Sequence, residues 1–161
     1  MTTPTVKQML AAASAILAVQ CGGGGTGPTT GQSTASIQVA STPQTIVYAV
    51  CPPSHCGPLA GQLEIEATLT LRESGGVAAT VNHLMLTIRR RSDNAAIAAN
   101  DVVGASAPIR VGASGSMPVP IAMHFDATAA EPNMKIVVAL DATDANGHQI
   151  ALSTEIEIRG P

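Results

Sequence analysis

Residues 62–72 (QLEIEATLTLR) alternate apolar and polar side chains without interruption. The apolar positions are Leu63, Ile65, Ala67, Leu69 and Leu71, and glutamates and threonines occupy the positions between them. A helix has about 3.6 residues per turn and would scatter both sets around its surface, whereas a strand places them on opposite faces. These residues are therefore predicted to form a half-buried β-strand.

The same alternation recurs along the chain. Long strands are predicted at residues 81–90, 117–125, 134–142 and 148–159, and weaker ones at 36–40, 45–50 and 107–111. Pro118 and Pro120 cannot donate hydrogen bonds to a ladder, so the strand that contains them is expected at a sheet edge. A series of seven or eight short strands separated by turns predicts an all-β, antiparallel β-sandwich over residues 36–161.

This strand pattern resembles the immunoglobulin-like and fibronectin-III-like domains that are common in bacterial surface lipoproteins. The resemblance covers roughly residues 36–160, without the core tryptophan or the sheet-joining cysteine pair of the immunoglobulin domains themselves. It implies an immunoglobulin-like β-sandwich of 7–8 strands.

The composition limits the partners. The 161 residues carry a formal net charge of −3, and the only aromatic residues are Tyr48 and Phe125. Neither the charge nor the scarcity of aromatic rings favours a surface for nucleic acid. We expect an aliphatic core, no nucleic-acid partner and no cofactor.

The N-terminal segment has the pattern of an export signal. Lys7 is the only charged residue before position 21, and residues 9–19 form an apolar run. A membrane span needs about 20 apolar residues, whereas a run of about 7 to 15 after a positive charge is typical of a secretory signal. Residues 1–20 are therefore predicted to be a signal peptide and the protein to be exported. The alternative is a short buried helix.

The sequence Ala18-Val19-Gln20-Cys21 resembles the lipobox of bacterial lipoproteins, in which a cysteine after small residues is acylated. The resemblance implies that Cys21 is lipidated and anchors the protein in a membrane, with the domain in the periplasm or at the cell surface. Residues 21–35 are expected to be a glycine- and threonine-rich linker with a mean reach of roughly 20 Å. Cleavage by ordinary signal peptidase, which leaves a free thiol, is the alternative.

Residues 51–56 (CPPSHC) are the stretch with the most reactive side chains. In an oxidising compartment, Cys51 and Cys56 are expected to close a small disulfide loop. Together with His55, the two cysteines could instead bind a soft metal ion. This alternative predicts a periplasmic metal-handling protein.

Other candidate sites are weaker. Asp141, Asp144 and Asn146 offer oxygen ligands to calcium, although the same residues are common in hairpin turns. Ser114 lacks the strand-to-helix setting of a nucleophile elbow. The basic run of residues 89–91 is most simply a solvated strand end.

No catalytic residue is predicted, because the four histidines lie in separate segments without flanking acid pairs: His55, His83, His124 and His148. We expect a non-enzymatic, membrane-tethered lipoprotein that binds or spaces a protein or glycan partner at the cell envelope. Contacts are expected from its loops, with residues 92–116 as a loop-rich surface, or from the edge strand that contains Pro118.

Overall fold

The computed structural model describes residues 33–104 and 107–160. The predicted signal peptide, Cys21 and most of the linker lie outside the described residues. In the described part, ten strands are connected mainly by short turns: β1 (Ile37–Thr42), β2 (Thr45–Val47), β3 (Ala49–Val50), β4 (Leu63–Glu73), β5 (Ala79–Arg90), β6 (Ala96–Asp101), β7 (Ile109–Val111), β8 (Ser116–Phe125), β9 (Asn133–Asp144) and β10 (Gln149–Arg159). The helical elements are single turns: α1 (Pro53–Cys56), η1 (Gly57–Leu59) and η2 (Ala127–Ala129). None of the helices in these residues is long and apolar enough to cross a membrane.

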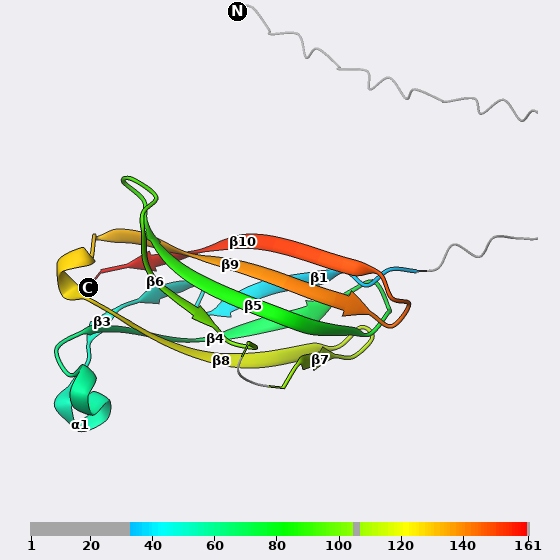
Figure 1. Cartoon of the computed structure of the whole chain (residues 1–161), viewed down its shortest axis with the longest axis horizontal. Coiled ribbons are helices and arrows are strands. Elements are labelled where there is room, and N and C mark those ends of the chain that lie inside the picture. Colours follow the sequence, from blue (N-terminus) through cyan, green and yellow to red (C-terminus); the bar gives the residue numbers. More distant parts are fainter. Residues whose placement is uncertain (1–32, 105–106, 161) are drawn as a thin grey trace, which may run out of the picture. The chain divides into compact units, whose positions relative to one another are not determined.

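The strands form two sheets (Figure 1). In the four-stranded sheet, β4 pairs with β8 along one edge and with β1 and β3 along the other. The six-stranded sheet has the order β2-β10-β9-β5-β6, and β7 also pairs with β5. The all-β prediction is confirmed.

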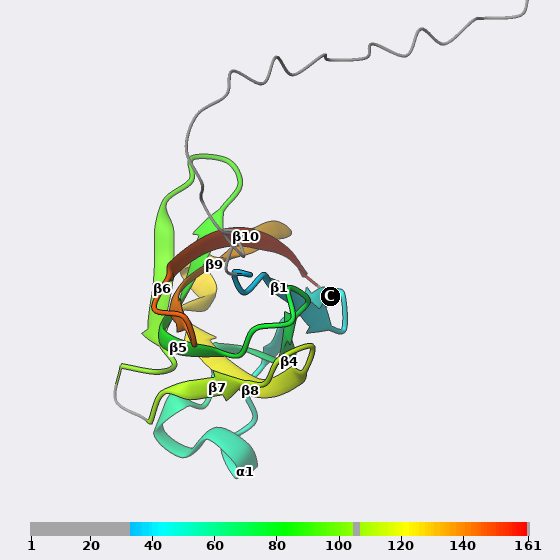
Figure 2. The same ribbon diagram turned by 90° about the vertical axis from the view of Figure 1, so that its right-hand side faces the viewer.

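The antiparallel prediction is wrong for one pair. β2 is reached from β1 by a crossover between the sheets rather than by a hairpin, and it pairs with β10 in parallel. The larger sheet is therefore mixed. Figure 2, which views the strands nearly end-on, shows that the sheets curl around a common interior instead of lying as two flat layers.

The predicted alternation places the core correctly. Ile65, Leu69 and Leu71 on β4 are fully buried, and the inward residues of β5 and β9 are buried as well. Met85, which lies between the buried Leu84 and Leu86 on β5, is 38% exposed, as the alternation requires of the outer face. Burial of this aliphatic set removes apolar surface from water, the main favourable contribution to folding.

Glu73, the last residue of β4, is a charged residue whose carboxylate is buried, unlike the apolar residues around it. Burial opposes its ionisation, but backbone N–H groups of four residues donate to it and outweigh this effect, so the pKa falls from 4.5 to about 2. The donors are Ser114, Ser36, Gly75 and Gly76. The carboxylate thus ties the end of β4 to the start of the domain and to the β7–β8 turn.

One prediction about local structure is wrong and another is incomplete. Residues 45–50 are not one strand, because β2 and β3 belong to different sheets. Residues 92–116 are rich in turns and loops in their described part, as predicted, but they also contain β6, which the sequence pattern did not predict. β6 escaped prediction because its half-buried and exposed positions do not alternate. The expected edge strand is confirmed, since β8 pairs only with β4 among the described strands.

Candidate functional site

The cysteine loop connects β3 to β4. Cys51 is buried, and its N–H donates to the carbonyl of Gln62 at 2.8 Å, which fixes the base of the loop. The helical turn α1 begins after Pro52, whose carbonyl accepts the N–H groups of His55 and Cys56 at 3.0 Å each. Pro53 occupies the first position of this turn, which suits proline because it has no N–H to leave unpaired and its φ is already helical.

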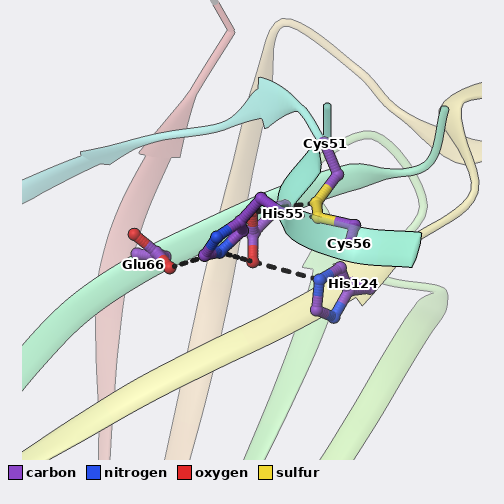
Figure 3. The surroundings of a disulfide bond; sticks show 6 residues. Cys51, His55, Cys56, Glu66 and His124 are labelled. Carbon is purple, nitrogen blue, oxygen red and sulfur yellow. Dashed lines mark hydrogen bonds and ion pairs between the residues drawn. A yellow bond between two sulfur atoms is a disulfide. The ribbon is translucent and has the colours of Figure 1, made fainter. Parts of the chain in front are cut away.

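The structure joins Cys51 and Cys56 in a disulfide, which Figure 3 shows at one end of α1. Their Cα atoms are 5.9 Å apart, within the usual span of about 4.4–6.8 Å. Cys56 is only half-buried, and neither α1 nor η1 contains a buried residue. The loop therefore rests on the domain through Cys51 and adds little to the core.

A carboxylate lies directly beneath the disulfide. Strand register pairs Glu64 on β4 with His124 on β8, so both side chains project from the same outer face. Glu64 Oε1 lies 3.0 Å from His124 Nε2. Glu64 Oε2 lies 3.0 Å from Cys51 Sγ and 3.6 Å from Cys56 Sγ. The Glu64 side chain is only 11% exposed, so it is held between the loop and the neighbouring strand.

His55 and Glu66 form the outer part of this arrangement. His55 Nε2 lies 3.7 Å from Glu64 Oε1 and 3.4 Å from Glu66 Oε1, and both outer side chains are well exposed. Figure 3 shows His55 between Glu66 and the disulfide, with His124 on the other side. An imidazole on each side of Glu64 can thus interact with the same carboxylate.

Two overlapping groups of possible ligand atoms result. In the first, which we call the thiol cluster, one donor atom from each of Cys51, Cys56, Glu64 and His124 lies within 4.8 Å of the others. In the second, donor atoms of His55, Glu64 and Glu66 meet the same distance limit. The sequence-based metal set of Cys51, His55 and Cys56 is therefore divided between the two groups.

Sequence reasoning missed Glu64 and His124 as members of the site. The alternation in residues 62–72 places Glu64 outward, and the buried Phe125 implies the same for His124. The missing information was the register of β4 against β8, which makes the two residues direct neighbours.

A surface hollow of about 340 Å³ lies beside one member of the thiol cluster, His124. His124 lines it together with Leu59 and Gln62 from the end of the cysteine loop, and with Ala98 and Asn100 on β6. The hollow gives a small solute access to His124 without any movement of the core.

The predicted calcium ligands do not converge. Asp141 is exposed, whereas Asp144 is buried and already accepts hydrogen bonds from three residues. Its donors are the Ala35 and Asn146 N–H groups and both the N–H and the ring of His148. Burial opposes ionisation of Asp144, but these bonds outweigh it and lower the pKa from 3.8 to about 2. Asp144 thus fastens the β9–β10 turn to the start of the domain.

The remaining candidates have local structural roles. His83 lies 3.5 Å from Asp101, away from the thiol cluster. Ser114 donates its N–H to Glu73. In the basic run, Arg90 forms two hydrogen bonds with Asp93 across the β5–β6 turn, which agrees with a solvated strand end.

No known protein family and no curated protein matches the sequence. Several solved structures resemble its fold, among them the following two. A Bordetella pertussis protein whose crystal structure carries the name ApaA gives a TM-score of 0.54 at 12% identity, covering 80% of this chain and 95% of that one. A structural-genomics target solved by X-ray crystallography also gives a TM-score of 0.54, at 11% identity, covering 79% of this chain and 87% of that one. At such identities the likeness concerns the fold alone.

Proposed function

We propose that this chain is an exported, non-enzymatic lipoprotein of the cell envelope, anchored through Cys21 and carrying an immunoglobulin-like β-sandwich that binds or spaces a partner. The observation that carries the fold assignment is the strand order. The series β1-β4-β8 and β10-β9-β5-β6 corresponds to the A-B-E and G-F-C-C′ orders of that fold. Export and anchoring are supported by the sequence, in which an apolar run, a cysteine and four glycines precede the domain.

The anchor can be tested by labelling cells with radioactive palmitate. We expect label on the native chain and none on Cys21→Ser, while Cys51→Ser serves as a cysteine control and keeps the label. In parallel, Cys21→Ser should leave the membrane fraction. Equal labelling of the native chain and Cys21→Ser would rule out Cys21 as the acceptor.

For partner binding, we propose the loops as the contact surface and a protein or glycan as the partner. The exposed edge of β8 suits strand addition poorly. Because Pro118 and Pro120 are part of the ladder with β4 and have no N–H, their nitrogens must face the free edge, which loses two donors there. Crosslinking in native cells, with the photoreactive group placed once in the β5–β6 turn and once on β8, distinguishes the two surfaces. Capture from β8 alone would contradict the loop proposal.

A second candidate function is metal handling. The observation that favours it is the thiol cluster, in which sulfur, nitrogen and oxygen donors from three separate segments meet within 4.8 Å. Such mixed donor sets are typical of sites for zinc and related transition metals. Native mass spectrometry of the protein isolated from the envelope without chelator tests this function. A mass increment of one metal ion supports it, and a metal-free mass after incubation with Zn²⁺ under both oxidising and reducing conditions contradicts it.

A further inference from the structure

We propose that Cys51, Cys56, Glu64 and His124 form a zinc-type site that binds metal only when the Cys51–Cys56 disulfide has been reduced. This inference rests on the metal-handling function proposed above. It adds the ligand set, the class of metal ion and a redox condition for binding.

The contacts of Glu64 are the first reason. In the disulfide state, the sulfurs that lie 3.0 and 3.6 Å from Glu64 Oε2 carry no proton to donate. These two sulfurs are the polar contacts of that oxygen among the described residues, although the side chain is only 11% exposed. A carboxylate in a side chain with so little exposure is stabilised by hydrogen-bond donors or a cation at its oxygens. Reduction supplies S–H donors, and a bound metal ion supplies a positive charge.

The spacing of the donors is the second reason. Tetrahedral zinc has bonds of about 2.0–2.3 Å, which sets roughly 3.3–3.8 Å between neighbouring ligand atoms. Glu64 Oε1 lies 3.0 Å from His124 Nε2, and the other oxygen, Oε2, lies 3.0 and 3.6 Å from the two sulfurs. One donor atom from each of the four residues lies within 4.8 Å of the others. The movements required are separation of the sulfurs from bonding contact to roughly 3.8 Å and a rotation of the Glu64 carboxylate that brings one oxygen to the same metal position as the sulfurs and His124. The Cys-x₄-Cys spacing lies within the range that zinc sites use.

The loop can make that movement without disturbing the core. Neither α1 nor η1 buries a residue, so Cys56 can shift with α1 while Cys51 stays fixed by its backbone hydrogen bond to Gln62. The hollow beside His124 offers the metal ion an entry route. His55 and Glu66 lie next to Glu64 and are suited to orient it from outside the ligand set.

The redox step balances with a dithiol as reductant. A thiolate of the reductant attacks Cys56 Sγ, the more accessible sulfur, and displaces Cys51 as a thiolate that takes up a proton. The second thiol of the reductant then releases Cys56 and closes the reductant's own disulfide. Two electrons and two protons pass to the loop. Binding of Zn²⁺ to the two thiols then releases two protons, because thiolates are the ligands.

The test uses the full chain carrying Cys21→Ser, purified in mild detergent, so that the loop supplies the only thiols. Oxidised and reduced samples are titrated with Zn²⁺ against a competing chelator, and with Co²⁺ for its visible absorption. We expect one equivalent of either metal on the reduced protein, with sulfur-to-cobalt charge transfer, and none on the oxidised protein. Circular dichroism of each sample checks that the domain remains folded.

Variants test the ligand set. In the reduced state, Glu64→Gln and His124→Ala should each weaken Zn²⁺ binding by more than the roughly 10- to 100-fold that is typical of a lost outer partner. His55→Ala should fall within that range, and His83→Ala, which lies outside the cluster, should bind like the parent. Unchanged binding in Glu64→Gln and His124→Ala would refute the ligand set.

Different results of these titrations would refute the redox condition and the metal-handling function. Equal binding by the oxidised and reduced proteins would refute the redox condition and leave metal handling in place. No binding by either form, with the fold intact, would refute both.

Discussion

Reduction of the Cys51–Cys56 disulfide should weaken the domain slightly and leave it folded. The bond closes a loop of six residues, from Cys51 to Cys56. Loop-closure entropy then gives about 7.4 cal/mol/K, which corresponds to about 2 kcal/mol at 25 °C. Typical domains have about 5–15 kcal/mol of unfolding free energy, so a loss of this size leaves a folded majority. No apolar burial needs to be lost as well, because neither helical turn in the loop contains a buried residue.

The measurement is urea unfolding of the Cys21→Ser chain in the presence of a metal chelator, with and without a phosphine reductant. The far-ultraviolet circular dichroism of the strands is the main signal, and Tyr48, the single tyrosine, gives a second probe. For a slope of about 1–3 kcal/mol/M, the midpoint should fall by roughly 1–2 M on reduction. A Cys51→Ala/Cys56→Ala double variant provides the control, because its midpoint should not respond to reductant.

Two outcomes would refute this reasoning. Loss of the cooperative transition on reduction would mean that the loop supports the core, which would also remove the basis for a site that operates in the reduced state. An unchanged midpoint, within about 0.3 kcal/mol of the oxidised protein, would mean that the bond does not restrict the unfolded chain as the loop-entropy argument requires.

Three further perturbations test the fold. Glu73→Gln should lower stability at neutral pH and reduce the slope of stability against pH by the equivalent of up to about one proton. Because the folded pKa is lowered from 4.5 to about 2, the stabilising contribution of the native carboxylate is complete above pH 4.5 and is lost as the pH falls through 2. Melting temperatures measured across this window test the prediction. Leu86→Ala should cost about 2–5 kcal/mol in urea unfolding, whereas Met85→Ala, one position along β5 and 38% exposed, should change stability by less than about 0.5 kcal/mol; similar costs at both positions would contradict the assigned faces. Arg90→Ala removes the pair with Asp93 and a longer contact with Glu131, and it should cost less than about 1 kcal/mol in the same assay. A larger loss would mean that these two contacts stabilise the domain more than surface ion pairs usually do.

The long strands could be predicted from the sequence because their inner and outer faces differ in chemistry. In residues 62–72, every second side chain is apolar, and a shift of one position would turn the whole set towards water. Strand β6 and the division of residues 45–50 between two sheets could not be predicted in this way. The side chains of these segments are small, or apolar and polar without regular alternation, so burial only weakly determines which sheet and which face they join.

The site was predictable only in part. Proximity along the chain suggested that Cys51, His55 and Cys56 act together. It could not identify His124 as a member of the site, because His124 is 68 positions after Cys56 in the sequence. Its place beside Glu64 depends on which strand pairs with β4 and in which register. That information lies in long-range pairing, which local patterns do not encode. Conversely, Asp144 and Asn146 looked like ligands because turn-forming and metal-binding residues share the same oxygen donors.

The position of the thiol cluster separates its chemistry from the stability of the domain. Ile65 faces the interior of β4 and is fully buried, while its neighbours Glu64 and Glu66 face outward beneath the cysteine loop. The alternation that builds the core therefore also presents the carboxylates, and the two faces share a backbone but few side-chain contacts. A change in the oxidation state of the loop alters the outer face and leaves the inner face packed. This separation is what a reversible thiol site requires, because a loop that supported the core could not open without unfolding the protein.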